Sequence, residues 1–329
     1  MREASSIDDA VSGVPPIACS TLIEHADHQA ALQPWIPMEC IQLGRGHILA
    51  QLDSLDLNCQ QVVRERQQAA IQKFGLTPFN ICTLSYCTPN PAFRFSELGA
   101  GDDKTVFFMP ANTEFDLRVP AGVETNYISL DQQEFLRAAR VLNPRGWEHP
   151  PTTIRQLAAL QKPELREVID LCFAVAHAAS ARGEAPDDAA MRHLLVQATQ
   201  HLATLAQGVH PPPSRTAHLR SFHICRLARD FAEHRLEGDE LPTVFDICCE
   251  VGVCERTLQY AFRDYIGMSP MAYLRLLRLN RVRAVLRVSS PRGTTVTRVA
   301  MRFGFLHLGR LAQDYRRAFG EPPSVTLAS

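Results

Sequence analysis

Two clusters of residues near the C-terminus have the side-chain types that contact DNA. Arginine and glutamine pair bidentately with the edges of guanine and adenine, and arginine also neutralises phosphates. We expect Arg256, Gln259 and Tyr260 to read bases in one major-groove segment, and Arg310 and Gln313 to engage the next segment. The full set of candidate DNA-binding residues is Arg256, Thr257, Gln259, Tyr260, Arg263, His307, Gly309, Arg310, Gln313, Arg316 and Arg317.

The elements that position these clusters form a pattern that occurs twice, at residues 243–267 and 295–320. Each copy opens with a threonine suited to helix N-capping, nine residues before Gly252 or Gly304. An apolar residue and a second amphipathic segment follow each glycine. A short helix, a glycine-bearing turn and a longer helix place that longer helix in the major groove of DNA. The repeat therefore predicts two helix-turn-helix units.

In the first unit, Thr243 and Asp246 have the spacing of a capping box. Gly252 ends the first helix, where a positive φ is needed. The recognition helix is expected at 255–265. The residues expected to be buried in these two helices are Phe245, Ile247, Cys248, Val251, Leu258, Ala261 and Phe262.

A long helix is predicted to join the two units. Ser269 and Pro270 suit its N-cap and first position, and it continues to about Val288. Its length of about 28 Å is close to the ~34 Å between successive major-groove faces on one side of DNA. The arginines expected to face outward, toward backbone phosphates, are Arg275, Arg278, Arg281, Arg283 and Arg287.

The second unit departs from favourable local design. Arg298 lies in the first turn of a helix, where a carboxylate suits the helix dipole, and His307 replaces a small polar cap before the recognition helix at 308–319. We expect this helix to read DNA shape and phosphates more than base sequence. It has Leu308, Gly309 and Ala312 at positions where base-reading side chains would lie. The residues expected to be buried in this unit are Val299, Ala300, Phe303, Leu311, Tyr315 and Phe319.

Charge is divided unevenly along the chain. Residues 215–329 contain 18 arginines, no lysine and 11 acidic residues, whereas residues 1–214 contain 16 basic and 24 acidic residues. The net charge of −1 hides this separation. A basic C-terminal third predicts a polyanionic partner, here double-stranded DNA.

The preceding part of the chain predicts a different architecture. Short β-type runs punctuated by turn residues indicate an antiparallel barrel or sandwich, and helical periodicity follows. The chain is thus divided into a loosely ordered leader at 1–37, a β-rich domain with helices at 38–207, a Pro-rich linker at 208–216 and the DNA-binding domain at 217–327. The apolar stripe of the last helix before the linker fits an intrachain core and a dimer seam equally: Leu194, Leu195, Ala198, Leu202 and Leu205.

Signals for other classes of protein are weak. No apolar run approaches 18 residues, no signal-peptide pattern opens the chain, and ten cysteines are scattered without a disulfide rhythm, which predicts a cytoplasmic protein. Cys248, Cys249 and Cys254 lack metal-ligand spacing, and His47 stands alone among the β runs. We expect no catalytic residue, metal or cofactor. The alternative is a cupin-like or cysteine-based enzyme that carries a DNA-binding tail.

The paired motif resembles the AraC/XylS family of bacterial transcription regulators over about residues 218–327. The matching segments are Ile247-Cys248, Gly252-Val253, Arg256-Thr257-Leu258, Phe262, Gly267-Met268-Ser269-Pro270, Tyr273-Leu274, Val299-Ala300, Gly304-Phe305, Phe319-Gly320 and Pro323-Ser324. The departures are Cys254, Arg298, Leu306 and Leu311. Residues 111–122 and 303–327 also look like the regulators of ethanolamine-utilisation operons.

The resemblance implies an α+β protein whose N-terminal half is a cupin-like sensor followed by helices that often dimerise. It also implies a C-terminal all-α domain with two helix-turn-helix units. A transcription activator of this type binds a small-molecule effector, promoter DNA and RNA polymerase, and it forms a homodimer in many cases.

Overall fold

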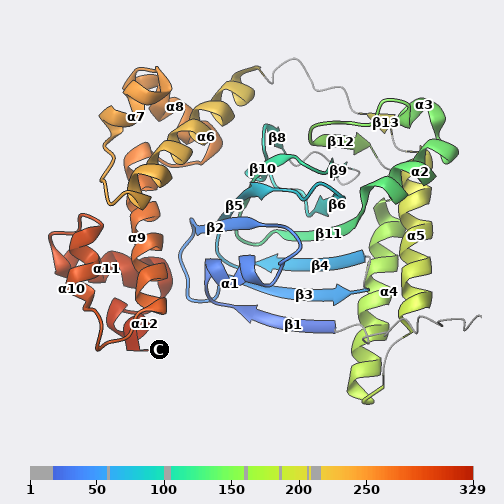
Figure 1. The fold of residues 1–329 in the computed structure, drawn as a ribbon, viewed down its shortest axis with the longest axis horizontal. Coiled ribbons are helices and arrows are strands. Elements are labelled where there is room, and N and C mark those ends of the chain that lie inside the picture. Colours follow the sequence, from blue (N-terminus) through green and yellow to red (C-terminus); the bar gives the residue numbers. More distant parts are fainter. Residues whose placement is uncertain are drawn as a thin grey trace, which may run out of the picture.

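The computed structural model describes residues 18–57, 60–99, 105–158, 162–184, 187–205, 207–208 and 216–328, which form an α+β protein. Two antiparallel sheets and five helices make up a β domain (residues 18–208), and helices alone make up a helical domain (residues 216–328). Helices α4 and α5 stand on one side of the sheets and the helical domain lies on the opposite side (Figure 1). The predicted fold class is confirmed.

The larger sheet of the β domain has eight strands in the order β1-β3-β4-β11-β6-β9-β12-β13. Neighbouring strands pair in antiparallel register, as between Tyr127 and Ser85. The strands are β1 (Ala18–Ile23), β3 (Ala50–Asp56), β4 (Gln60–Gln67), β6 (Ile81–Cys87), β9 (Thr105–Met109), β11 (Glu124–Asp131), β12 (Arg155–Ala158) and β13 (Gln207–Gly208).

The smaller sheet has five strands in the order β2-β5-β10-β7-β8 and packs on the larger one. The core between the sheets includes Phe95 and Phe107, whose ring centroids are 5.4 Å apart. Burying aromatic rings of this size contributes much of the stability of such a sandwich. The strands are β2 (Met38–Gln42), β5 (Ile71–Leu76), β7 (Arg94–Phe95), β8 (Leu98–Gly99) and β10 (Glu114–Val119).

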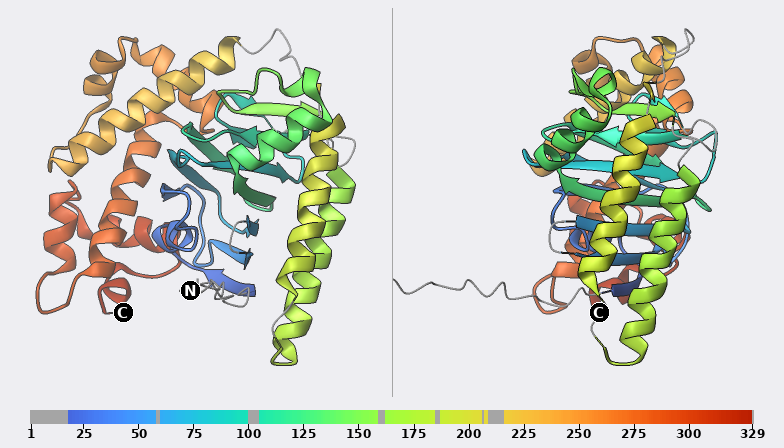
Figure 2. Two further views of the ribbon diagram at one scale, coloured as in Figure 1. Left: turned by 45° about the vertical axis from the view of Figure 1, so that its right-hand side comes forward. Right: turned by 90° about the vertical axis from the view of Figure 1, so that its right-hand side faces the viewer.

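Helices cover the other face of the eight-stranded sheet (Figure 2). Successive strand residues point to opposite faces, so Phe107 enters the core between the sheets while Phe108 packs on the rings of Phe135 and Trp147. Leu195 and Leu202 of the apolar stripe lie in this second core and Ala198 packs against it, whereas Leu194 is half-buried. The helices are α2 (Gln132–Leu142), α3 (Pro144–Trp147), α4 (Lys162–Ala181) and α5 (Asp188–Leu205).

The segment expected as a loosely ordered leader is structured from residue 18 onward. Strand β1 pairs with β3 along its whole length, and helix α1 (Ala26–Ala31) packs against β2. The expectation is therefore wrong for 18–37, because edge pairing with β3 supplies hydrogen bonds that local sequence signals do not reveal. Residues 1–17, and most of the predicted linker at 209–215, lie outside the described part of the chain.

The helical domain follows the sequence prediction closely. Each recognition helix, α8 and α11, spans the predicted residues, and α9 begins after the Ser269 N-cap and runs the predicted length to Val288. One hydrophobic core serves both units and extends into the β domain at Ile41 of β2 and at Leu43, which follows that strand. The helices are α6 (Thr216–Glu237), α7 (Val244–Val251), α8 (Glu255–Tyr265), α9 (Pro270–Val288), α10 (Val296–Arg302), α11 (Leu308–Phe319) and α12 (Pro323–Ala328). Among the described residues, no helix is long and apolar enough to span a bilayer.

Candidate DNA interface

The first helix-turn-helix unit is fixed by reciprocal hydrogen bonds at the start of α7. The Asp246 backbone N–H donates to Thr243 Oγ1 at 3.2 Å, and the Thr243 backbone N–H donates to Asp246 Oδ2 at 2.9 Å. These bonds hold the pKa of the Asp246 carboxyl below its usual range. At the other end of α7, Gly252 adopts the left-handed conformation with φ of 69°. The predicted capping box and glycine turn are confirmed.

One residue of α7 differs from the prediction. Phe245, expected in the core, is 75% exposed, whereas Ile247 is buried. Two residues of a helix separated by two positions lie about 200° apart around its axis, so the side that buries Ile247 leaves Phe245 in solvent. Cys248 and Val251 are only half-buried.

Recognition helix α8 divides its side chains as expected. Leu258, Ala261 and Phe262 are buried, while Arg256, Tyr260 and Arg263 are exposed and Thr257 and Gln259 are half-buried. The exposed face is partly ordered before any ligand arrives. The Arg256 guanidinium lies 5.5 Å from the centre of the Tyr260 ring and donates to its hydroxyl at 3.3 Å. Gln259 Nε2 donates to Glu255 Oε1 at 3.0 Å.

The second unit repeats the geometry with fewer polar contacts. Thr295 Oγ1 accepts the Arg298 backbone N–H at 3.2 Å, but Arg298 cannot return the bond that Asp246 makes in the first unit. His307, the N-cap of α11, makes no side-chain capping bond. Val299, Ala300, Phe303, Leu311, Tyr315 and Phe319 are buried as predicted.

The six candidate residues of the second unit all lie on the exposed side of α11 or at its N-cap. Within the part of the chain that the structure describes, their side chains form no ion pair. Arginines without intramolecular partners remain available for phosphates. These residues are His307, Gly309, Arg310, Gln313, Arg316 and Arg317.

The arginines of α9 are not the free outward row that the sequence suggested. Arg283 is only 4% exposed and donates to Gln42 Oε1 at 3.3 Å, which contradicts the expected outward position. The other four are half-buried and held within the chain: Arg275 pairs with Asp314, Arg278 lies on Phe305, Arg281 pairs with Glu233, and Arg287 pairs with Asp27. The cause is the position of α9 between both units and the β domain, which leaves it little free surface.

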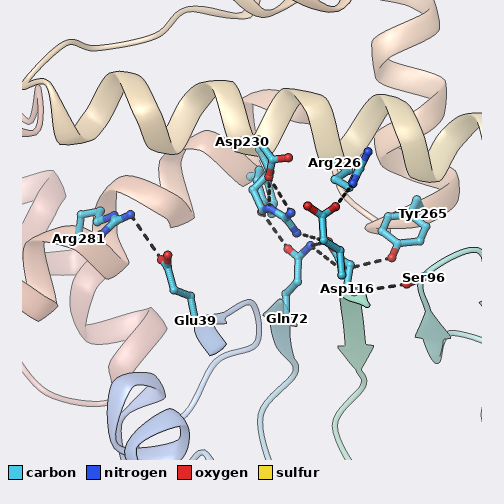
Figure 3. Close-up of polar contacts among 11 residues, drawn as sticks. Glu39, Gln72, Ser96, Asp116, Arg226, Asp230, Tyr265 and Arg281 are labelled. Atoms are coloured by element: carbon cyan, nitrogen blue, oxygen red, sulfur yellow. Dashed lines mark hydrogen bonds and ion pairs between the residues drawn. The ribbon is translucent and has the colours of Figure 1, made fainter. Parts of the chain in front are cut away.

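A buried polar cluster that the sequence did not reveal joins the two domains (Figure 3). Asp116 of β10 is 1% exposed and accepts from Arg229 of α6, from Gln72 of β5 at 2.9 and 3.0 Å, and from the hydroxyl of Tyr265 at 3.2 Å. Burial raises the pKa of this carboxyl, and Arg229 only partly opposes that effect. Three donors on two oxygens indicate that the ionised form is the one bound. Tyr273 of α9 completes the cluster by donating to Gln72 Oε1 at 2.8 Å.

The β domain holds the C-terminal ends of both recognition helices. Arg118 of β10 donates to the Tyr265 carbonyl of α8 at 3.1 Å. The backbone N–H of Gly46 and the side chain of Gln42 both donate to the Ala318 carbonyl of α11 at 3.0 Å. The last carbonyl groups of a helix have no hydrogen-bond donor within that helix, and these contacts supply donors from the β domain.

Two observations bear on the metal and thiol alternatives. Among the described residues, no group of three or more histidine, cysteine and carboxylate side chains is placed to hold a metal ion. Cys254, the exposed N-cap of α8, contacts Thr257 Oγ1 at 3.2 Å, and that hydrogen bond lowers the pKa of its thiol, which favours the reactive thiolate.

Comparison with known proteins gives matches to part of the chain. The family model described as a helix-turn-helix domain matches residues 247–329. A probable thc operon regulatory protein of Rhodococcus erythropolis is 38% identical over 104 residues, which are 32% of this chain and 31% of that protein. The XylDLEGF operon transcriptional activator of Pseudomonas putida is 44% identical over 72 residues, 22% of each chain. The chain thus spans less than a third of the length of these curated relatives.

A solved structure also matches about a third of the chain. It is a probable AraC family transcriptional regulator from Rhodopseudomonas palustris CGA009, 34% identical, with 32% of this chain and 94% of that chain covered and a TM-score of 0.29. The family model, the curated relatives and the two helix-turn-helix units agree that the helical domain is a helix-turn-helix domain similar to those of AraC-type transcription regulators.

Proposed function

We propose that the chain is a sequence-specific transcription activator that binds promoter DNA through α8 and α11. The observation that carries this proposal is the pair of exposed recognition faces on helices whose opposite faces share one core. A shared core fixes the spacing and orientation of the two faces, as two successive groove segments require.

The two recognition helices take different parts in this proposal. Arg256, Gln259 and Tyr260 of α8 contact base edges, because their side chains have the matching donors and acceptors. Arg310 and Gln313 engage the next groove segment, and Arg316 and Arg317 contact phosphates. Thr257, Arg263, His307 and Gly309 complete the surface that faces DNA.

The remaining partners follow from the family. We propose that a small-molecule effector acts through the β domain and that the protein works in the cytoplasm with RNA polymerase, as a possible homodimer. Activation is supported by the name of the Pseudomonas putida relative, which is a transcriptional activator. A link to ethanolamine-utilisation operons rests on residues 111–122 and 303–327 alone and stays a prediction.

Fluorescence anisotropy tests the central proposal. The full chain is titrated with duplexes from its own gene neighbourhood and with random duplexes, at two salt concentrations. We expect tight, salt-sensitive binding that favours a neighbourhood sequence. Arg316→Ala and Arg317→Ala should weaken binding to all duplexes and lower the salt slope by about one unit for each lost phosphate contact. Loss of binding to only one sequence would contradict the phosphate role, and absence of any DNA binding would contradict the proposed function.

A further inference from the structure

A small cavity inside the β domain measures about 30 Å³, and most of its lining is apolar, with Lys73 and Tyr127 among its polar members. Lys73 forms a buried ion pair with Glu65, which also accepts from Tyr127 at 3.1 Å and from Gln33 at 2.7 Å. Small-molecule sites usually occupy about 300–1,000 Å³, so this cavity has room for a water or two and not for an organic effector.

A cavity of about 620 Å³ lies instead between the β domain and α6. One wall consists of the ends of β5 and β10, the β7–β8 turn and residues 152–154, and the other wall is one face of α6. Figure 3 shows Ser96 on the first side and Arg226 and Asp230 on the second. The volume suits a small organic molecule that would touch both domains at once.

The cavity has uncovered apolar surface on both walls. Leu76 of β5 is 47% exposed and Leu219 of α6 is 39% exposed, and both line the cavity beside Phe115 and Phe222. An occupant with an apolar body would remove this surface from water, which is favourable at about 25 cal/mol per Å².

Arg226 lines the cavity, and its guanidinium group can donate a further hydrogen bond there. Its only ion-pair partner among the described residues is Glu114, whose side chain is 71% exposed. Its Nε is buried and has no hydrogen-bond partner within the described chain. Arg229, by contrast, is already held by Asp116 and Asp230. A buried guanidinium N–H without an acceptor is costly, and a carboxylate satisfies it with a second bond from the same fork.

The backbone of the β-domain wall is also unusual. Ser96 and Asn112, which line the cavity, have φ of 50° and 53°, and the described chain contains one other non-glycine residue with positive φ, Asp239. Such conformations cluster at ligand sites, because the surrounding structure must hold them in place.

We propose that this cleft binds a small carboxylic acid with an apolar body, and that the acid is the effector. Its carboxylate would take the place of Glu114 on Arg226, with His223 one turn away on the same face of α6. Glu97 and Asp230 also line the cleft and exclude a second negative charge from the rest of the ligand. The effector role rests on the proposed function, whereas the binding site does not.

The cleft is connected to the first recognition helix. Arg229 lines the cavity and donates to Asp116, and Asp116 accepts from Tyr265, the last residue of α8. A ligand that moves α6 relative to the β domain therefore changes contacts at the end of α8. Occupancy of the cleft would alter DNA affinity by this route.

Calorimetric titration of the full chain without DNA tests the site. Hexanoate and phenylacetate are compared with their amides and with hexylammonium and phenethylammonium. We expect a carboxylate to bind and its amide and amine counterparts to bind about tenfold or more weakly. Arg226→Gln should remove that preference, and Leu219→Trp, which fills the cleft, should abolish binding. Arg182→Gln, on an exposed arginine of α4, is the matched control.

Each outcome decides one claim. If no carboxylate binds at millimolar concentration, or if binding survives both Arg226→Gln and Leu219→Trp, the cleft is not the site. If the ammonium ions bind better, the ligand class is wrong. The anisotropy assay is then repeated with the binding carboxylate. Unchanged DNA affinity would overturn the effector role alone, while failure of the unliganded protein to bind any DNA would overturn the proposed function and leave the site intact.

Discussion

The two helix-turn-helix units share a backbone plan but differ in how their ends are stabilised. The first has a complete capping box at Thr243 and a partly ordered recognition face around Arg256. The second has only the threonine half of that cap at Thr295, and His307 gives α11 no capping bond. The comparison teaches that one shared core can keep a weakly capped unit folded, since tertiary packing supplies most of the stability of short helices.

The units also differ in their contacts with the β domain. The end of α8 is tied to a buried, charged cluster around Asp116, whereas the end of α11 is held through neutral donors to the Ala318 carbonyl. A charged buried cluster is sensitive to the loss of any one member, and a neutral contact is more tolerant. The first unit is therefore the one more tightly coupled to the β domain.

The largest expected effect comes from breaking the charged contact. Asp116→Ala leaves Arg229 buried without its main partner and should lower the free energy of unfolding by about 3–5 kcal/mol. Gln42→Ala, at the contact with the second unit, should lower it by about 1–3 kcal/mol. Urea denaturation of both variants measures the difference. The double variant Asp116→Leu/Arg229→Leu should recover much of the loss. If both single variants were destabilised equally, the charged contact at Asp116 would be no more important for stability than the neutral contact at Gln42.

The next effect separates the recognition helices on DNA. Arg256→Ala should weaken binding by about 1–3 kcal/mol and relax specificity at one base position, because a bidentate base contact is lost. Arg310→Ala should produce a smaller and less position-dependent loss, because α11 has fewer base-reading side chains. Anisotropy with a set of single-base operator variants checks this. An even loss over all duplexes for Arg256→Ala would assign that residue to phosphates.

A smaller effect compares the two caps. Thr243→Ala and Thr295→Ala should each cost about 0.5–2 kcal/mol, with the larger cost at Thr243 because the reciprocal bond from Asp246 is lost as well. The midpoint of urea unfolding gives both values, and Thr243→Ser is a control that keeps the hydroxyl. If Thr295→Ala lowers the stability more than Thr243→Ala does, the second unit depends on its N-cap, and the shared core alone does not keep it folded.

The smallest effect is a pH dependence at the contact between α1 and α9. Burial, with Arg283 and Arg287 nearby, lowers the pKa of His25 to about 4, against the opposing effect of Asp27 and Glu24. Between the ordinary value of about 6.5 and about 4, the unfolded chain takes up a proton that the folded chain does not. Stability should therefore fall as the pH decreases through this window.

Thermal unfolding at pH 7 and pH 5 measures this dependence. His25→Gln should reduce the difference between the two pH values, whereas His193→Gln, an exposed control, should leave it unchanged. A variant without His25 that keeps the full pH dependence would show that other groups are responsible.

Local signals were sufficient to predict much of the helical domain. The Ser269-Pro270 start of α9, the glycine turn at Gly252 and the bounds of both recognition helices follow from residues within one or two turns of each feature. Such signals act through the backbone nearby and need no distant partner. The change from short β-type runs to helical periodicity in the first part of the chain also agrees with the observed order of sheets and helices.

Strands β2, β4 and β5 carry weak sequence signals for a physical reason. Their residues include glutamines and charged side chains, above all in β4, which are typical of turns and surfaces. In the fold, Glu65 of β4 and Lys73 of β5 form a buried ion pair, and Gln33 donates to Glu65. Polar residues become core residues only when partners distant in sequence satisfy their hydrogen bonds.

The sequence by itself determined where the helices of each helix-turn-helix unit begin and end and which face carries the arginines that can meet DNA. Only the tertiary structure decided which charged side chains are exposed and which are held in buried contacts. Along β10, Phe115, Leu117 and Val119 point to the core while Asp116 and Arg118 face outward, a pattern that predicts a solvated surface. That surface instead carries the helical domain. Whether a charged side chain is solvated or paired depends on the groups that pack against it. For Asp116 those groups lie about 110 to 150 positions away in the sequence, so only the fold brings them together.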